Sequence, residues 1–240
     1  MFRLDIDRGV ARLTLDRPEA RNAIPAAGWD ALAERVAGAR RSAARLLLVE
    51  GTGGAFCAGA DLADFAALGA DEGAPVQFRQ AMRRALDALA GLPMPTVARI
   101  EGACYGAGVA LALACDLRIA AASARFAITP AKLGLAYPQE DVHRLVGLVG
   151  AGQAARLLFT AGEIDAAEAA RIGLVELAGE EAESVAAAIL ANSADSLEAL
   201  KRSIRLAAAG RRTDAGQDRR FDALIGGEEL RRRLEARRRK

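Results

Sequence analysis

Alternating apolar and polar residues open the chain and predict a β-hairpin. Residues 2–6 (FRLDI) and 10–15 (VARLTL) alternate with a period of two, and an Asp-Arg-Gly turn separates them. This period places every second side chain on the same face of a strand, and a short turn containing glycine reverses the chain. We therefore expect the chain to begin with two paired antiparallel strands.

Helical and strand patterns alternate along the rest of the chain. Apolar residues at helical spacing predict helices at 25–44, 76–89, 106–113, 142–149 and 151–160. Short apolar runs predict strands at 46–50, 96–100, 116–121 and within 173–179. A loop is expected over residues 124–141, and the chain beyond residue 180 is expected to be helical. Strands separated by helices predict an α/β fold with a mainly parallel sheet and helices outside it.

The composition is that of one soluble unit with a full core. The chain has 240 residues, of which 52% are apolar and 27% charged. The first residues, MFRLDIDRG, are charged from position 3, and the longest uncharged run (102–115) is too short to span a bilayer. We therefore predict a cytoplasmic protein with no membrane partner. The net charge of +2 is too small to suggest a nucleic-acid partner.

Cysteines and the basic C-terminus add little to the functional prediction. Cys57, Cys104 and Cys115 are odd in number and lack the spacing of metal ligands, so reduced, buried thiols and no metal site are expected. The last ten residues, RRRLEARRRK, fit a solvated helix face. They also fit a patch for a phosphorylated ligand, because arginine forks match phosphate oxygens.

Two glycine-rich turns follow predicted strands, at 51–62 (GTGGAFCAGADL) and 102–108 (GACYGAG). Such turns let backbone N–H groups approach a polar or anionic ligand, since no Cβ stands in the way. The second turn has the glycine spacing of short-chain dehydrogenases. That fingerprint belongs at the first strand-to-helix turn of a chain, whereas about a hundred residues precede it here. The Tyr-x-x-x-Lys pair of those enzymes is also missing. The fourth residue after Tyr105 is Val109, and the fourth residue after Tyr137 is Asp141, so neither tyrosine is followed by a lysine at that spacing.

Four segments in order resemble the crotonase, or enoyl-CoA hydratase/isomerase, family. The two glycine turns resemble its signatures through AFCAGADL (55–62) and PTVARIEGACYGAGVALALACDLRIAA (95–121). The segment LDRPEARNAI (15–24) resembles the family's loop after the hairpin, and residues 154–178 resemble its segment after the active-site loop. The resemblance covers nearly the whole chain.

The resemblance implies a spiral of ββα turns over residues 1–185 and a C-terminal helical region over 186–240. This region is expected to cover the pocket or to hold the subunits of a homotrimer or homohexamer together. It also implies an acyl-CoA substrate, whose coenzyme A part makes a separate cofactor unnecessary. Members hold the thioester oxygen with two backbone N–H groups. Matched residue by residue, these donors are Ala60 and Ala107. The positions matching segments that contact the substrate or its coenzyme A are Arg21, Asn22, Ala23, Ala58, Asp61, Leu62, Gly106 and Phe221.

The sequence departs from the family where hydratases carry two catalytic glutamates. One position matches Ala110, and the other matches Pro130, or Ala131 if the loop shifts by one. Since none of these side chains carries a proton, we expect isomerase-like or other enolate chemistry rather than efficient hydration. The alternative is a catalytically silent acyl-CoA binder.

Two acidic residues downstream are the candidate proton carriers. Glu140 and Asp141 follow the segment expected to line the pocket, although both also suit the N-terminus of a helix. The single histidine, His143, is expected to be a surface or packing residue, and Asp116 is expected to be structural. An ionisable group within reach of the reacting carbons would separate the enzyme from the silent binder.

Overall fold

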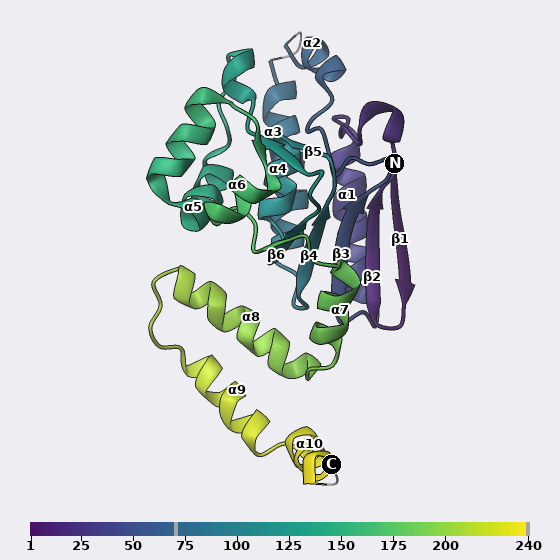
Figure 1. Cartoon of the computed structure of the whole chain (residues 1–240), viewed down its shortest axis with the longest axis vertical. Helices are drawn as coiled ribbons and strands as arrows, with labels where there is room; N and C mark the ends of the chain where they lie inside the picture. The colour runs from purple at the N-terminus through teal and green to yellow at the C-terminus, as the bar shows by residue number, and fades with distance from the viewer. Residues whose placement is uncertain (70–71, 239–240) are drawn as a thin grey trace.

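A mainly parallel sheet of six strands forms the centre of the computed structural model, which describes residues 1–69 and 72–238 (Figure 1). Its strands, in spatial order, are β1 (Phe2–Asp7), β2 (Val10–Leu15), β3 (Leu46–Gly51), β4 (Thr96–Ile100), β6 (Leu117–Ala120) and β9 (Leu177–Ala178). Strands β1 and β2 pair antiparallel, and every later neighbour is parallel. The predicted hairpin and parallel sheet are thus confirmed.

A second, smaller sheet contains β5 (Ala103–Tyr105), β7 (Arg125–Ala127) and β8 (Ile164–Asp165). The chain passes from β4 in the large sheet to β5 in the small one, and then from β6 to β7. The turn after β3 follows the same course, because Cys57 is bridged in parallel to Cys104 of β5. Each circuit adds backbone to both sheets, which is the expected spiral.

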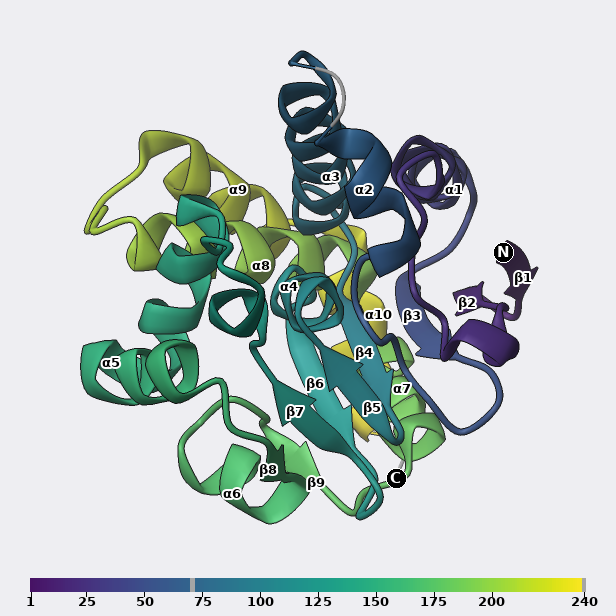
Figure 2. The same ribbon diagram turned by 90° about the horizontal axis from the view of Figure 1, so that it is seen from above.

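Helices cover the large sheet on both faces (Figure 2). Strand β3 is apolar throughout, since Leu47 and Val49 join the main core while Leu46 and Leu48 join a smaller cluster on the other face. The helices are α1 (Gly28–Arg41), α2 (Phe65–Leu68), α3 (Ala74–Ala90), α4 (Ala107–Leu113), α5 (Gln139–Thr160), α6 (Ala166–Arg171), α7 (Ala182–Leu190), α8 (Ala194–Ala208), α9 (Ala215–Ile225) and α10 (Glu228–Arg238). Helices α1, α3 and α4 contribute to the main core, whereas α7 packs on the smaller cluster.

The prediction of a loop over residues 124–141 was wrong in part. This segment contains β7, a 3-10 turn at Pro130–Leu133 and the beginning of α5 at Gln139. Strand β7 has only three residues, too few to show a period of two, and is held by its pairing with β5 and β8. The predicted break between two helices is confirmed, since Gly150 adopts φ 74° and ψ 162° inside α5.

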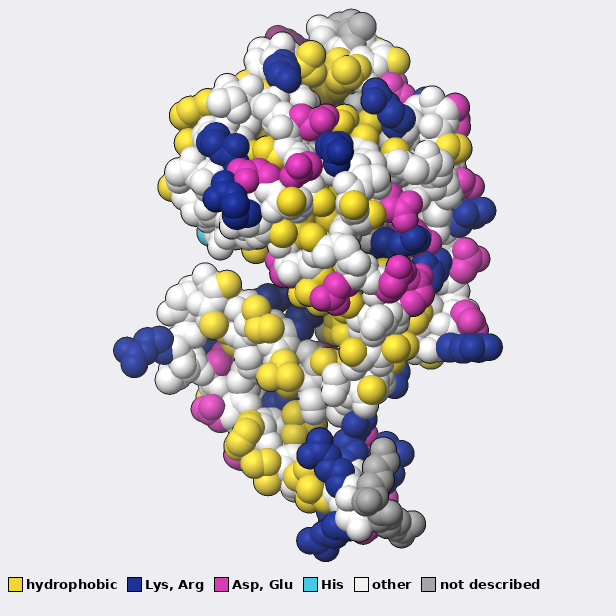
Figure 3. Space-filling view, viewed as in Figure 1, with side chains coloured by type: hydrophobic (Ala, Val, Ile, Leu, Met, Phe, Trp, Pro, Cys, Tyr) yellow, Lys and Arg dark blue, Asp and Glu magenta, His cyan; other side chains and the backbone are white. Residues whose placement is uncertain are grey.

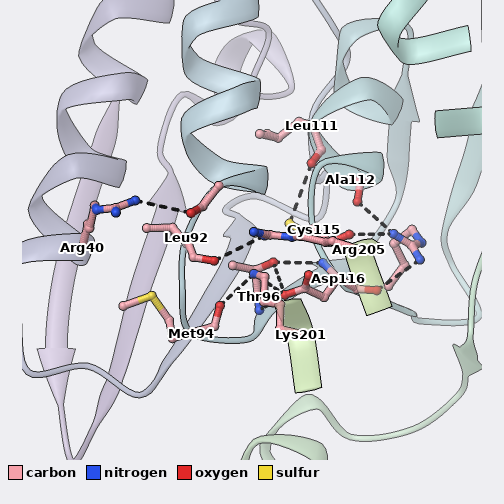
Figure 4. A network of polar contacts seen from close by, with 12 residues as sticks. Arg40, Leu92, Met94, Thr96, Leu111, Ala112, Cys115, Asp116, Lys201 and Arg205 are labelled. Carbon is pink, nitrogen blue, oxygen red and sulfur yellow. Dashed lines mark hydrogen bonds and ion pairs between the residues drawn. The ribbon is translucent and has the colours of Figure 1, made fainter. Parts of the chain in front are cut away.

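Helices α8, α9 and α10 extend away from one end of the large sheet (Figure 1). Helix α7 crosses the predicted domain boundary between residues 185 and 186 and packs on the sheet. Helix α8 is attached to the core by buried Lys201, whose Nζ donates to the Met94 carbonyl at 2.8 Å (Figure 4). Arg205 of the same helix donates to the Leu92 carbonyl at 3.3 Å.

Asp116 completes this attachment, in agreement with its predicted structural role (Figure 4). Its Oδ2 lies 2.5 Å from Nζ of Lys201 and also accepts hydrogen bonds from the Thr96 N–H and hydroxyl. One carboxylate therefore ties the starts of β4 and β6 to α8. No helix in the described ranges is both long and apolar enough to cross a membrane.

Candidate active site

The two glycine-rich turns meet where α4 begins. Cys57 donates its N–H to the Ala103 carbonyl and accepts from the Tyr105 N–H, both at 2.9 Å. Helix α4 then starts so close to this turn that a Cβ on Gly108 would lie 2.2 Å from the Cys57 carbonyl oxygen. Only glycine permits this approach between the helix and the turn.

Ala60 and Ala107 line the same cavity, whose volume is about 230 Å³. Within the described residues, neither residue's backbone N–H has a hydrogen-bond acceptor. Ala107 is the first residue of α4, so the positive end of the helix dipole also favours a negative charge there. Gly59, at φ 106°, has no room for a Cβ, which would lie 2.9 Å from the Tyr105 carbonyl oxygen. The structure thus brings the two predicted donors together.

The loop before α1 is fastened to the first glycine turn. Arg21 and Asn22 both have positive φ, and the buried Asn22 donates to the Thr52 and Ala55 carbonyls at 2.9 and 2.7 Å. Ala58 donates to the Arg21 carbonyl at 2.9 Å, and Ile24, beside the half-buried Ala23, donates to the Gly59 carbonyl at 2.8 Å. These bonds place residues 21–23 beside the predicted oxyanion turn.

Asp61 and Leu62 continue from this turn toward solvent. Asp61 forms an ion pair with Arg17 at 2.5 Å, and this hydrogen bond holds the pKa of its carboxyl below the usual value. Leu62 is 59% exposed. Both residues directly follow Ala60 in the chain, but neither lines the cavity.

The cavity walls are mostly apolar, and sequence reasoning missed them. They come from Phe65 of α2, from Phe78 and Met82 of α3, and from Leu135 before α5. Phe78 and Met82 are four residues apart on one helix face, a spacing that equally describes core residues. Only the position of α3 over the glycine turns shows that they line a site.

Both positions that match the hydratase glutamates face this cavity. Ala110 and Pro130 line it, whereas Ala131, the alternative to Pro130, is exposed and does not. Tyr137 lines the same cavity and donates its hydroxyl to the Gly106 carbonyl at 3.0 Å. Burial raises the pKa of Tyr137 well above its ordinary value, so the hydroxyl keeps its proton.

The structure separates the two candidate proton carriers. Asp141 is completely buried and lines the cavity. Its Oδ1 accepts hydrogen bonds from Arg83 at 3.3 Å and Arg144 at 3.2 Å, while its buried Oδ2 has no hydrogen-bond partner among the described residues. Burial raises the pKa of Asp141, although both arginines act to lower it. Glu140 is 52% exposed, lies 3.7 Å from Arg83 and is absent from the cavity wall.

Three other residue groups lie away from the cavity. His143 is exposed, as expected. Phe221 is 62% exposed and lines a separate groove formed by α8, α9 and α10. In the basic C-terminus, Arg232 and Arg233 form ion pairs with Glu229.

The three cysteines are buried and free, as predicted. Cys57 belongs to the first glycine turn, where its Sγ accepts a hydrogen bond from the Gly59 N–H at 3.4 Å. Burial raises the pKa of Cys57 to about 12, so the thiol is not ionised at neutral pH.

Comparison with known proteins identifies this arrangement. The family model for enoyl-CoA hydratase/isomerase matches residues 5–223. The chain belongs to the enoyl-CoA hydratase/isomerase family. The solved structure of a family member from Hyphomonas neptunium superposes with a TM-score of 0.91 at 38% identity, covering 98% of this chain and 93% of the other. The crotonase fold is therefore confirmed, and the dehydrogenase interpretation is discarded.

Curated family members align over a shorter stretch. A "probable enoyl-CoA hydratase" of Rhodobacter capsulatus is 39% identical over 176 residues, which is 72% of this chain and 66% of the relative. The human mitochondrial enoyl-CoA hydratase domain-containing protein 2 is 36% identical over 171 residues, 70% of this chain and 58% of the relative. The aligned region thus spans less than two thirds of these relatives' length.

The close approach at Gly108 can be tested by substitution. We expect Gly108→Ala to lower the free energy of unfolding by about 2–3 kcal/mol, because the added methyl forces α4 away from the Cys57 carbonyl. The same displacement separates the two predicted donors, so binding of CoA esters should weaken. Denaturant titration and a ligand-binding assay measure the two effects.

Gly147→Ala is the matched control, because its Cβ would meet no atom within 4 Å on an exposed part of α5. It should stabilise the protein by about 0.5–1 kcal/mol, since alanine restricts the unfolded chain more than glycine does. Equal stability and binding in Gly108→Ala and the parent would contradict the proposed packing.

Proposed function

We propose that this family member is an acyl-CoA-binding enzyme that forms a thioester enolate and moves a proton along the acyl chain. In this proposal the N–H groups of Ala60 and Ala107 hold the thioester oxygen, and Asp141 carries the proton. The supporting observation is that Ala60, Ala107 and Asp141 line one cavity, and that the two backbone N–H groups and Oδ2 of Asp141 have no hydrogen-bond partner among the described residues. These are the minimum parts for forming and stabilising an enolate.

The proposed reaction moves a proton from one carbon of the acyl chain to another. Asp141 takes a proton from the acyl chain through Oδ2, and the electron pair of that C–H bond delocalises onto the thioester oxygen. The two N–H groups stabilise the resulting charge, and each such donor is worth roughly 10²–10³ in rate. Return of the proton to a different carbon moves the double bond and regenerates the carboxylate. A pKa raised by burial strengthens Asp141 as a base for this step.

Hydration is disfavoured by the two positions that match the family glutamates. Ala110 and Pro130 line the cavity but cannot exchange a proton with water. General acid–base groups are typically worth about 10²–10⁴ each, so their loss would slow hydration strongly. The same two residues favour the second candidate function, a catalytically silent acyl-CoA binder, if Asp141 does not reach the substrate.

The surrounding loops complete the proposed binding site. We assign coenzyme A to the surface made by residues 21–23, 58 and 61–62, next to the donor at Ala60. Since coenzyme A arrives as part of the substrate, the proposal includes no separate cofactor. A cytoplasmic location is part of the same proposal.

We further propose that the protein assembles as a homotrimer or homohexamer through its C-terminal helices. Large apolar side chains are exposed there, and hydrophobic atoms gather on the face shown in Figure 3. On α8 and α9 they are Leu200, Ile204, Phe221 and Ile225, which are 58–69% exposed. Such a cluster is typical of a protein interface. In an assembly, Phe221 could then reach a neighbouring subunit's pocket.

Binding of CoA thioesters is the first test. A short acyl-CoA should raise the free energy of unfolding by about 2.7 kcal/mol at a hundredfold excess over its dissociation constant. NAD and NADP should cause no shift, because the glycine turns are assigned to a thioester oxygen. Thermal-shift measurements over a panel of CoA esters provide the readout. Stabilisation by a dinucleotide alone would refute the assignment.

The chemical step is tested with two neighbouring substitutions. We expect slow hydration of a short 2-enoyl-CoA and measurable exchange of acyl-chain protons with solvent. Exchange, followed by NMR in heavy water, should fall at least about 10²-fold in Asp141→Asn, because the base is removed. Glu140→Gln is the matched control, since this exposed carboxylate lies outside the cavity wall.

Each outcome of this experiment has a definite meaning. Exchange that persists in Asp141→Asn would show that another group moves the proton. Binding without any exchange in the parent would favour the silent acyl-CoA binder. Fast hydration in the parent would show that a glutamate of the family pattern lies elsewhere in this chain.

Assembly has a separate readout. Multi-angle light scattering at micromolar concentration should report three or six subunits, because exposed leucine, isoleucine and phenylalanine side chains become buried between copies. A monomer under these conditions would contradict the proposed assembly without affecting the proposed chemistry.

A further inference from the structure

Four charged side chains join α3 to α5 in a closed ring. Arg83 and Asp87 lie one turn apart on α3, and Asp141 and Arg144 lie one turn apart on α5. Both arginines donate through Nη1 to Oδ1 of Asp141, at 3.3 and 3.2 Å. Both also contact Oδ1 of Asp87 through Nη2, each at 2.9 Å. Two guanidinium groups thus bridge two carboxylates.

The two carboxylates of the ring have different surroundings. The Asp141 side chain is 0% exposed and forms part of the cavity wall, whereas the Asp87 side chain is 55% exposed. The arginines between them are 16% and 20% exposed. Asp87 therefore marks the solvent side of the ring, and Asp141 its cavity side.

The hydrogen bonds restrain Asp141 from one side only. Both arginines bind the same oxygen, Oδ1, and Oδ2 has no partner in the part of the chain that the structure describes. Two donors on one oxygen fix the rotation of the carboxylate, since turning it would break both bonds. A carboxylate held in this way keeps its other oxygen in a constant position.

We propose that Arg83, Arg144 and Asp87 are positioning residues that hold Asp141 by Oδ1 and present Oδ2 to the acyl chain. This inference rests on the function proposed above for Asp141. Asp87 does not contact Asp141 in this proposal. It pairs with both guanidinium groups from the solvent side, and its negative charge weakens their effect on Asp141. None of the three residues lines the cavity, so none is assigned contact with the substrate.

The charges around Asp141 predict that removing an arginine and removing the Asp87 charge shift the pKa of Asp141 in opposite directions. Arg83 and Asp87 face it from α3, Glu140 and Arg144 lie on its own helix, and Tyr137 adjoins it from the preceding loop. Arg79 of α3 lines the same cavity. Burial raises the pKa of Asp141 and its arginines lower it. Losing one arginine should therefore raise that pKa, whereas losing the charge of Asp87 frees both arginines and should lower it.

The test is the pH dependence of acyl-proton exchange in Arg144→Gln and Asp87→Asn. Exchange requires ionised Asp141, so its rate rises with pH to a plateau. Relative to each variant's own plateau, the rate on the acidic side should fall about tenfold in Arg144→Gln and rise several-fold in Asp87→Asn. This normalisation removes differences in the amount of folded enzyme. Asp30→Asn, which breaks the ion pair between Asp30 of α1 and Arg84 of α3, should leave the profile unchanged.

Binding separates a failure of this inference from a failure of the proposed function. Affinity for a CoA ester should change less than about threefold in the ring variants, because the ring does not touch the ligand. If the pH profiles of Arg144→Gln and Asp87→Asn did not shift, or both shifted in the same direction, the positioning role would be wrong while Asp141 would remain the base. If exchange in the parent were absent or independent of Asp141, both the proposed function and this inference would be wrong.

Discussion

The contact between the start of α4 and the carbonyl of Cys57 is the constraint on which the candidate site depends. It requires glycine at position 108, because any side chain there would meet the carbonyl oxygen. It also requires the turn after β3 to pair with β5, which the Cys57–Cys104 bridge accomplishes. Two N–H groups from segments nearly fifty residues apart in the sequence thereby line one cavity. The spiral of strands is what brings these segments together.

The proposed chemistry uses two kinds of group, namely backbone N–H groups held by the fold and a carboxylate held by charged side chains of two helices. The N–H groups of Ala60 and Ala107 are held by the first glycine turn and by the first turn of α4, so little reorganisation would be needed if negative charge developed there, as proposed. The carboxylate of Asp141 instead comes from the first turn of α5. Its orientation depends on α3, which supplies Arg83. In the proposed mechanism, the relative position of α3 and α5 therefore sets the distance from Asp141 to the thioester.

Local patterns in the sequence were sufficient for the large sheet and the glycine turns. The alternation in β1 and β2 and the apolar run in β3 are properties of neighbouring residues, so they can be read directly. Strands β5 and β7 have three residues each, and their conformation comes from pairing partners that are distant in the sequence. No local period indicates such strands.

The same distinction applies to the site. The two glycine turns carry a motif, whereas two adjacent acids at the start of a helix do not show whether Glu140 or Asp141 belongs to the site. Both acids approach Arg83 of α3, and only Asp141 is buried and lines the cavity, so the choice depends on tertiary packing. The apolar cavity wall has no motif either, because Phe78 and Met82 resemble ordinary core residues of a helix. Packing converts these common residue types into a binding surface.

The first glycine turn contains the thiol of Cys57, and this position determines when the thiol can be oxidised. The Cys57 sulfur is completely buried against the Gly59 N–H, and burial keeps it protonated, so an oxidant has neither access nor a thiolate to attack while the fold is closed. Once the chain opens, the same sulfur becomes reactive, and a sulfinic acid would be too large and too polar to return to its place. Oxidation of this thiol would therefore require the chain to open first.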